Sequence, residues 1–200
     1  MTDYKFTQDW FSHNIPVWEQ LAKMLPGRAG TRHFLEIGSF EGRSMVWIAE
    51  NMMQDGDVMD CVDTWEGSEE HKNGELNGAE ERFDYNHALL EDKFPEKWVI
   101  KNKDTSTYSL ALWLIDINPD PSFDFIYIDG SHVAKDVLTD ACMAWPKLKQ
   151  GGLMVFDDYL WGESRDILHR PRLAVDFFVN IFAESLDIVH IGHQFVVRKK

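Results

Sequence analysis

The chain has 200 residues, and its hydrophobic share of 44% is enough for one folded domain with a full core. Its net charge of −14 disfavours nucleic acid and anionic membranes as partners, because both are bound through clustered Lys and Arg. The first residues, MTDYKFTQDWF, do not show a basic region followed by an apolar one, so we expect no signal peptide. No apolar run in the sequence reaches membrane-spanning length. We therefore expect a cytoplasmic protein that acts on a small molecule.

Apolar periodicity and breaks at glycine and proline divide the chain into alternating elements. In chain order we expect a helical segment over 1–30, a strand at 33–38, a helix at 43–53, a strand at 57–62, an exposed polar insertion at 66–82, a helix at 83–93, a strand at 97–101, a helix at 107–115, a breaker at 118–121, a strand at 123–128, a helix at 134–147, a strand at 153–156, an irregular loop at 159–172, a helix at 173–184, and strands at 187–191 and 194–198.

This alternation predicts an α/β fold with a doubly wound, mostly parallel sheet that helices cover on both faces. The last two strands are joined only through Gly192-His193, and so short a connection permits only an antiparallel hairpin. We expect residues 1–200 to form a single Rossmann-like domain, with the helical segment of residues 1–30 packing on its core.

The two cysteines, Cys61 and Cys142, lie in a strand-like and a helix-like segment. We expect both to be buried free thiols, which is typical of a reducing compartment. Neither belongs to a CxxC or Cys/His pattern, so we do not expect a structural zinc site.

A glycine-containing turn follows the first predicted strand. Residues 36–44 read E-I-G-S-F-E-G-R-S, with Glu36 in the strand and Gly38 and Gly42 in the turn. We expect Glu36 to anchor either the loop or the ammonium group of the cofactor. Glycines between a strand and a helix let a nucleotide-like ligand lie against the backbone, because no Cβ blocks its approach. Asp63 ends the second strand, where an acidic residue can accept both ribose hydroxyls. The alternative is that Asp63, like Asp104 after the third strand, only caps a turn or a helix.

Three carboxylates follow two later strands. Asp129 ends strand 123–128, and Asp157 and Asp158 end strand 153–156. Neighbouring parallel strands bring their carboxyl ends together, so we expect these acids to converge and to repel one another unless a cation intervenes. Mg²⁺ suits such oxygen ligands. The alternative is that these residues only begin turns or accept backbone amides.

His132 follows Asp129 by three residues and is the candidate general base, since a histidine pKa near neutrality suits removal of a hydroxyl proton. Alternatively it caps the next helix or supports the carboxylates.

We expect Tyr127 to be a packing residue, and Trp10 and Trp18 could close over a ligand. A loop with Tyr159, Trp161, Arg165, Arg170 and Arg172 is either a lid or an ordinary solvated loop. The remaining histidines are expected to be surface or turn residues: His13, His33, His71, His87, His169, His190 and His193.

Four motifs together resemble the class I S-adenosylmethionine (SAM) dependent methyltransferases. They are FLEIGSFEGRS, CVDTWEGS, DFIYIDGSH and LKQGGLMVFDDY. The closest resemblance is to the small-molecule O-methyltransferase branch, which includes metal-dependent sugar methylases of macrolide and aminocoumarin biosynthesis and cephalosporin-hydroxylase-like relatives. It covers roughly residues 33–160. In that branch the base is an acid or histidine just after IDG, which falls on His132 because position 131 is serine.

The resemblance implies SAM as cofactor and Mg²⁺ held by Asp129, Asp157 and Asp158. It also places Asp104, with Thr105 and Ser106, at the adenine edge. Trp65 is an aromatic residue close to Asp63 and is expected to lie against the adenine ring. The candidate cofactor-binding residues are Glu36, Gly38, Ser39, Gly42, Ser44, Asp63, Thr64, Trp65, Asp104, Thr105 and Asp129.

The expected activity is Mg²⁺-assisted methylation of a hydroxyl on a small molecule or sugar, with no nucleic-acid or membrane partner. A homodimer is plausible from the many aromatic residues. Two alternatives stay open: a metal-independent SAM methyltransferase, and a non-catalytic binding or assembly protein with the same fold. A metal-dependent hydrolase is disfavoured by the intact glycine turn.

Overall fold

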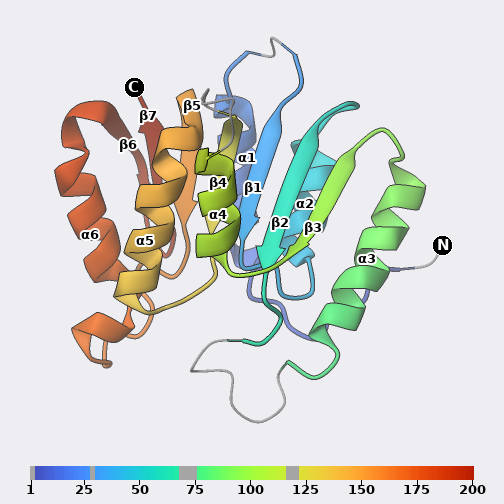
Figure 1. Cartoon of the computed structure of the whole chain (residues 1–200), viewed down its shortest axis with the longest axis horizontal. Helices are drawn as coiled ribbons and strands as arrows, with labels where there is room; N and C mark the ends of the chain where they lie inside the picture. Colours follow the sequence, from blue (N-terminus) through green and yellow to red (C-terminus); the bar gives the residue numbers. More distant parts are fainter. Residues whose placement is uncertain (1–2, 28–29, 68–75, 116–121) are drawn as a thin grey trace.

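Seven strands form one mixed sheet in the part of the chain that the computed structural model describes, namely residues 3–27, 30–67, 76–115 and 122–200. The strands are β1 (His33–Ile37), β2 (Val58–Asp63), β3 (Trp98–Lys103), β4 (Phe123–Ile128), β5 (Leu148–Phe156), β6 (Leu186–Ile191) and β7 (Phe195–Lys199). Their order across the sheet is β3-β2-β1-β4-β5-β7-β6. Strands β1 to β5 run parallel, whereas β7 is antiparallel to both β5 and β6 (Figure 1). The predicted doubly wound sheet with an antiparallel C-terminal hairpin is confirmed.

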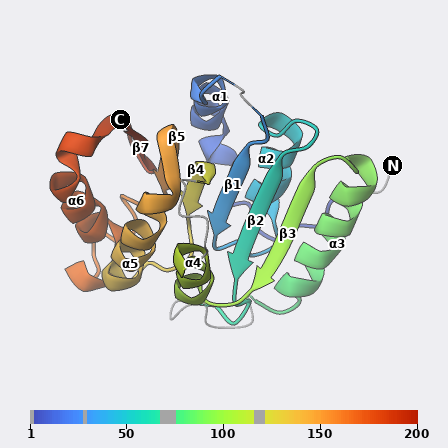
Figure 2. The ribbon, with the colours of Figure 1, turned by 45° about the horizontal axis from the view of Figure 1, so that its top comes forward.

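Helices cover both faces of this sheet (Figures 1 and 2). They are α1 (Ile15–Met24), α2 (Arg43–Asn51), α3 (Ala79–Lys93), α4 (Ser106–Ile115), α5 (Ala134–Ala144) and α6 (Pro171–Ile181), with 3-10 turns at Ser12–Asn14, Trp145–Lys147, Ile167–His169 and Ala183–Ser185. One apolar cluster joins α1, α2 and α3 to the sheet, and a second joins α4, α5 and α6 to the other face. Strand β4 contributes to both apolar clusters, and all six of its residues are buried.

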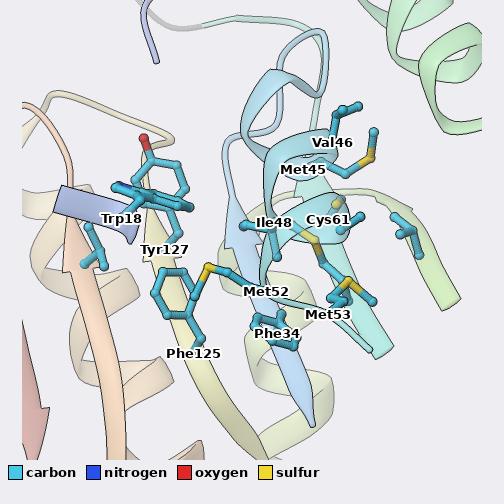
Figure 3. Close-up of a cluster of buried hydrophobic side chains, with 14 of the residues drawn as sticks. Trp18, Phe34, Met45, Val46, Ile48, Met52, Met53, Cys61, Phe125 and Tyr127 are labelled. Atoms are coloured by element: carbon cyan, nitrogen blue, oxygen red, sulfur yellow. The ribbon is translucent and has the colours of Figure 1, made fainter. Parts of the chain in front are cut away.

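The alternation of side chains along β4 assigns them to the two layers. Phe125 and Tyr127 belong to the α1–α2 cluster, whereas Ile126 and Ile128 belong to the cluster on the other face. Figure 3 shows the first cluster, with Trp18 of α1 lying against the ring of Tyr127. Their ring centroids are 4.8 Å apart in an edge-to-face arrangement. The Tyr127 side chain therefore runs from the core toward the carboxyl end of β4.

Several element boundaries differ from those expected. Helix α3 begins at Ala79 rather than 83, and α6 spans 171–181 rather than 173–184. Helix α5 ends at Ala144 instead of 147, because Pro146 has no N–H to continue the helical hydrogen bonds. Strand β5 begins at Leu148 rather than 153, because the strand runs through Gly151-Gly152 instead of starting after them. Residues 68–75 of the expected insertion and the breaker at 118–121 lie outside the described residues.

The prediction that both cysteines are buried is wrong for Cys142. Cys61 is buried in β2, but Cys142 is exposed. Helix α5 buries Val137, Ala141 and Ala144, which repeat at helical spacing on one side. Cys142 follows Ala141 by one residue and is therefore turned away from that side by about 100°. No helix among the described residues has the length and the apolar character needed to cross a membrane.

Candidate active site

A cleft of about 1270 Å³ opens at the carboxyl ends of the parallel strands. Its walls come from the segments that follow β1 to β5, from the turn between β6 and β7, and from the N-terminal segment. Ligands of open parallel sheets bind at this edge, because the strand order reverses there between β1 and β4. Nearly all the predicted site residues line this cleft; Glu36 and Gly42 do not.

The glycine turn after β1 is shaped by contacts within the protein. Gly38 and Gly42 have positive φ angles of 89° and 79°. A Cβ on Gly38 would overlap the backbone carbonyl of Asp129, and one on Gly42 would lie 2.8 Å from Cε of Met45. The Cβ position of each glycine is therefore occupied by the protein itself, at Gly38 by the segment after β4 and at Gly42 by side chains of α2 and α3. Their predicted contact with the cofactor stays a prediction. Gly38 still lines the cleft, with its backbone exposed to it.

Glu36, in β1, holds this turn in place through a buried hydrogen bond to α2. It is fully buried, and its Oε1 accepts a hydrogen bond of 2.5 Å from the Ser44 hydroxyl in the first turn of α2. Burial raises the pKa of Glu36 to about 7, although the Ser44 hydrogen bond acts in the opposite direction. Of the two roles expected for Glu36, the structure shows the anchoring of the loop. Ser44 itself lines the cleft.

Asp63, at the end of β2, organises the same turn through backbone amides. Its Oδ2 accepts hydrogen bonds of 2.8 Å from the amides of both Ser39 and Phe40, and its Oδ1 accepts one of 2.7 Å from Trp65. Carboxylates that accept several amides hold a loop firmly, because charge-assisted hydrogen bonds are the stronger kind. Asp63 thus joins the β1 and β2 turns while it lines the cleft.

The predicted adenine-side residues also line the cleft, in different environments. The indole of Trp65 donates to the carbonyl of Phe40 over 2.7 Å and packs against Phe83, which leaves only 9% of the residue exposed. Thr64 lies beside it. The Asp104 carboxylate accepts a hydrogen bond of 2.8 Å from the backbone amide of Thr105. Thr105 itself is an exposed residue of the cleft lining. Trp65 therefore lines the cleft as a nearly buried side chain, and its contact with an adenine ring stays a prediction.

Tyr127 links two of the three predicted carboxylates. Its hydroxyl lies 2.9 Å from Oδ2 of Asp129 and makes a shorter hydrogen bond to Oδ2 of Asp157. One hydroxyl proton serves one acceptor at a time, so simultaneous contacts require a second proton. Burial, together with the charges of Asp157 and Asp158, raises the pKa of Asp129 well above its usual range. Tyr127 is the packing residue that we expected, because its ring is buried in the core, and its hydroxyl in addition contacts two of the carboxylates.

His132 contacts the third of the predicted carboxylates, Asp158; we call Asp129, Asp157 and Asp158 the acidic cluster. Its Nε2 is 2.5 Å from Oδ2 of Asp158, and its ring lies 4.1 Å from that of Trp161. The Arg165 guanidinium lies over the Trp161 ring, 4.3 Å from its centroid. The loop after β5 therefore packs over His132 while the histidine stays in the cleft wall.

The structure adds a residue that the sequence analysis placed outside the site. His193, in the turn between β6 and β7, has its Nδ1 3.8 Å from Asp157 and its Nε2 3.7 Å from Asp158. Contact with Asp157 raises the pKa of His193 despite partial burial. Asp157, Asp158 and His193 offer ligand atoms that all lie within 4.8 Å of one another, whereas Asp129 is connected to them through Tyr127. His13 and His169 also line the cleft.

The N-terminal segment closes one side of the cleft. Trp10 stacks on Phe40 with a centroid separation of 5.0 Å. Glu41, almost fully buried, accepts hydrogen bonds from Thr7 and forms a 2.6 Å ion pair with Arg82 of α3. Trp10 therefore lies where a ligand would be covered.

The expectation that Trp18 could close over a ligand is wrong, whereas the lid and the solvated loop both stay open as interpretations of the loop after β5. Trp18 is a core residue with no exposed surface, because α1 inserts it beside Tyr127. Of the loop after β5, Trp161 and Arg165 line the cleft, whereas the Tyr159 hydroxyl bonds to Asp176 on α6.

The strand order and the cleft define a Rossmann-like protein with a cofactor-sized site. A family model described as a methyltransferase domain matches residues 35–159, which is more than half of the chain. The chain therefore belongs to this methyltransferase family. The predicted resemblance and the predicted enzyme class are confirmed. A comparison with curated proteins finds no match.

Solved structures share the fold at low sequence identity. The O-methyltransferase from Bacillus cereus in complex with SAH is 19% identical with a TM-score of 0.59, over 97% of this chain and 84% of that one. The O-methyltransferase TomG from Streptomyces achromogenes, in complex with SAM, is 15% identical with a TM-score of 0.66, over 96% of this chain and 82% of that one. The mycinamycin-pathway methyltransferase MycE, in complex with Mg, SAH and mycinamycin VI, is 16% identical with a TM-score of 0.58. The alignment with MycE covers 96% of this chain but 50% of that chain.

Proposed function

We propose that the protein transfers a methyl group from SAM to a hydroxyl of a small molecule, with assistance from a bound Mg²⁺. One observation carries this proposal: the glycine turn with Asp63 and the acidic cluster with His132 face a single cleft. The cleft, at about 1270 Å³, exceeds the usual range of about 300–1,000 Å³ for one small ligand. It therefore has room for a cofactor and an acceptor together.

The cofactor end would be formed by the turns after β1, β2 and β3. Gly38 and Ser39 would lie against the amino acid part, Asp63 would accept a ribose hydroxyl, and Asp104 would meet the adenine edge. Asp63 already accepts three backbone amides, two on Oδ2 and one on Oδ1. A carboxylate has about four lone-pair sites, so Asp63 can hold the turn and still receive one hydroxyl on Oδ1.

The acceptor end would be formed by the acids after β4 and β5. Asp129, Asp157 and Asp158 fit a divalent ion because they are mutually repulsive oxygen donors in a largely buried place. When bound, such an ion orients a hydroxyl and lowers its pKa. The MycE structure contains Mg, which supports this assignment by analogy of fold alone.

His132 would remove the proton of the acceptor hydroxyl. It lies in the cleft wall next to Asp158, and Trp161 restricts the orientation of its ring. A positioned histidine accepts a proton at neutral pH, and alignment of the two reactants supplies much of the remaining rate. The net charge of −14 supports a small acceptor and opposes nucleic acid.

A metal-independent methyltransferase is the second candidate, and a specific observation favours it. The Tyr127 hydroxyl contacts Asp129 and Asp157, and His132 contacts Asp158, so protein groups already meet each carboxylate. In this case the acids would shape the pocket and hold His132 in place without an ion.

Calorimetric titration of SAM and SAH, with Mg²⁺ and then with EDTA, tests the proposal. Binding that is abolished in Asp63→Ala would support the cofactor site. A separate Mg²⁺ heat that is lost in Asp157→Ala would support the metal. SAM binding and methyl transfer that persist in EDTA would favour the second candidate. Absence of SAM and SAH binding would overturn the proposal and leave a binding or assembly protein with a methyltransferase fold.

A further inference from the structure

The turn between β6 and β7 brings a nitrogen donor to the acidic cluster. His193 lies beside both Asp157 and Asp158, with nitrogen-to-oxygen distances of 3.8 and 3.7 Å. An imidazole between two carboxylates that come from another strand end is an arrangement found in mixed nitrogen and oxygen metal sites. The three side chains come from β5 and from the hairpin that β7 forms beside it.

The distances are compatible with ligation of one ion. Metal–ligand bonds of about 2.0–2.2 Å place neighbouring octahedral ligand atoms about 3 Å apart and opposite ones about 4.2 Å apart. The two short contacts start from different ring nitrogens, Nδ1 toward Asp157 at 3.8 Å and Nε2 toward Asp158 at 3.7 Å, and an ion would bind only one of them. With one ligand atom taken from each residue, all three atoms lie within 4.8 Å of one another. Small side-chain rotations would therefore suffice to bring them onto an ion.

The position of His193 is fixed by its neighbours. Its backbone carbonyl accepts a hydrogen bond of 2.8 Å from the amide of Tyr159. The next residue, Gln194, is 1% exposed and accepts 2.6 Å from the indole of Trp18 in the core. The His13 ring meets the His193 ring edge-on at 5.4 Å. A turn held on both sides presents its imidazole at one place, as a metal ligand requires.

We infer that His193 is a ligand of the divalent ion together with Asp157 and Asp158, and that the site prefers first-row transition ions to Mg²⁺. This inference rests on the proposed metal-assisted function. Imidazole suits transition ions, whereas Mg²⁺ takes oxygen ligands, so a nitrogen donor shifts the preference. Asp129 accepts a hydrogen bond from the Tyr127 hydroxyl and does not belong to the group of three ligand atoms formed by Asp157, Asp158 and His193.

Mn²⁺ bound to the whole chain tests the inference directly. Pulsed EPR of the Mn²⁺-loaded protein detects ¹⁴N coupled to the ion, and we expect this coupling to disappear in His193→Ala. Calorimetry should show that Co²⁺ binds the wild-type protein more tightly than Mg²⁺. In His193→Ala, Co²⁺ affinity should fall by about tenfold or more, with a smaller change for Mg²⁺. His190→Ala, in the same hairpin but outside the cleft lining, should retain both affinities and the nitrogen coupling.

The outcomes separate this inference from the proposed function. Mn²⁺ binding without nitrogen coupling in the wild-type protein, or coupling that survives in His193→Ala, would overturn the assignment of His193 and leave the metal site standing. If neither Mg²⁺ nor Mn²⁺ binds the wild-type protein, the metal-assisted function fails as well. Because the wild-type spectrum is itself decisive, the test does not depend on the folding of a variant.

Discussion

Nε2 of His132 lies 2.5 Å from Oδ2 of Asp158, so the candidate base is in contact with one of the candidate metal ligands. The two residues come from different strand ends, His132 from the segment after β4 and Asp158 from the segment after β5. Trp161 lies against the imidazole from the same loop as Asp158. The orientation of His132 therefore depends on the loop after β5, and acid cluster and base form one unit.

His132→Gln tests the catalytic role within this unit. We expect kcat to fall by about 10²–10⁴-fold because the hydroxyl proton loses its acceptor, while SAM affinity is retained. Transfer of radiolabelled methyl to an acceptor found by screening hydroxylated compounds measures the first effect, and calorimetry measures the second. His190→Gln, outside the cleft lining, is the control. A His132→Gln enzyme with wild-type kcat would exclude the base assignment.

Asp63→Asn and Asp104→Asn separate cofactor binding from loop stability. Asp63 uses both oxygens to accept three amides, and an Asn side chain has only one oxygen, so at least one amide loses its acceptor. We expect Asp63→Asn to lower the free energy of unfolding by about 1–3 kcal/mol. Asp104 accepts the Thr105 amide through one oxygen, which Asn can replace.

Both of these variants should weaken SAM binding by about tenfold or more, since each loses a charged group at the proposed cofactor end. Urea unfolding and calorimetry on the same samples give the two quantities. Equal losses of stability in the two variants would contradict the distinction that the hydrogen bonds draw between them.

Gly38→Ala and Gly42→Ala form a second matched pair. Each places a Cβ on a residue with positive φ, which costs about 1–2 kcal/mol by itself. At Gly38 the added atom would also overlap the Asp129 backbone, whereas at Gly42 it would meet the flexible end of Met45. We therefore expect Gly38→Ala to be the more destabilising in thermal unfolding. A smaller loss for Gly38→Ala than for Gly42→Ala would show that the β1 turn can move away from β4.

The fold and much of the candidate site could be predicted from the sequence, because their signals are local. The turn after β1 and the acids after β4 and β5 each follow an apolar run directly, and parallel strands must bring those ends together. Element types were therefore predicted well. Boundaries were predicted less well where Pro146 ends α5 early and where β5 runs through Gly151-Gly152.

His193 and Tyr127 could not be assigned to the site in the same way. His193 reaches the acids only because β7 inserts between β5 and β6, a pairing that a single hairpin signal does not fix. Tyr127 lies in a strand whose residues are all buried, and only its hydroxyl at the end of the ring meets Asp129 and Asp157. The local pattern shows that it is buried and not what its polar atom contacts.

Glu36 gives the protein a pH-dependent stability that can be measured without substrate. Its pKa is about 7 in the folded chain, compared with an ordinary value of 4.5, because burial disfavours the charged form. Below about pH 4.5 the group is protonated in both states and its contribution is fully present. Between about pH 4.5 and 7 only the folded state keeps the proton, so the free energy of unfolding falls as the pH rises. The total change is on the order of 3 kcal/mol.

Glu36→Gln should remove this dependence, because a neutral amide resembles the protonated acid and its oxygen can still accept the Ser44 hydroxyl. We expect the stability of the variant relative to wild type to increase from about pH 5 to about pH 8, as measured by urea unfolding followed by circular dichroism. Asp140→Asn is the comparison, because burial raises the pKa of Asp140 only to about 6 and its effect should be complete at lower pH. A stability difference between Glu36→Gln and wild type that is constant over this range would mean that Glu36 stays ionised in the folded protein.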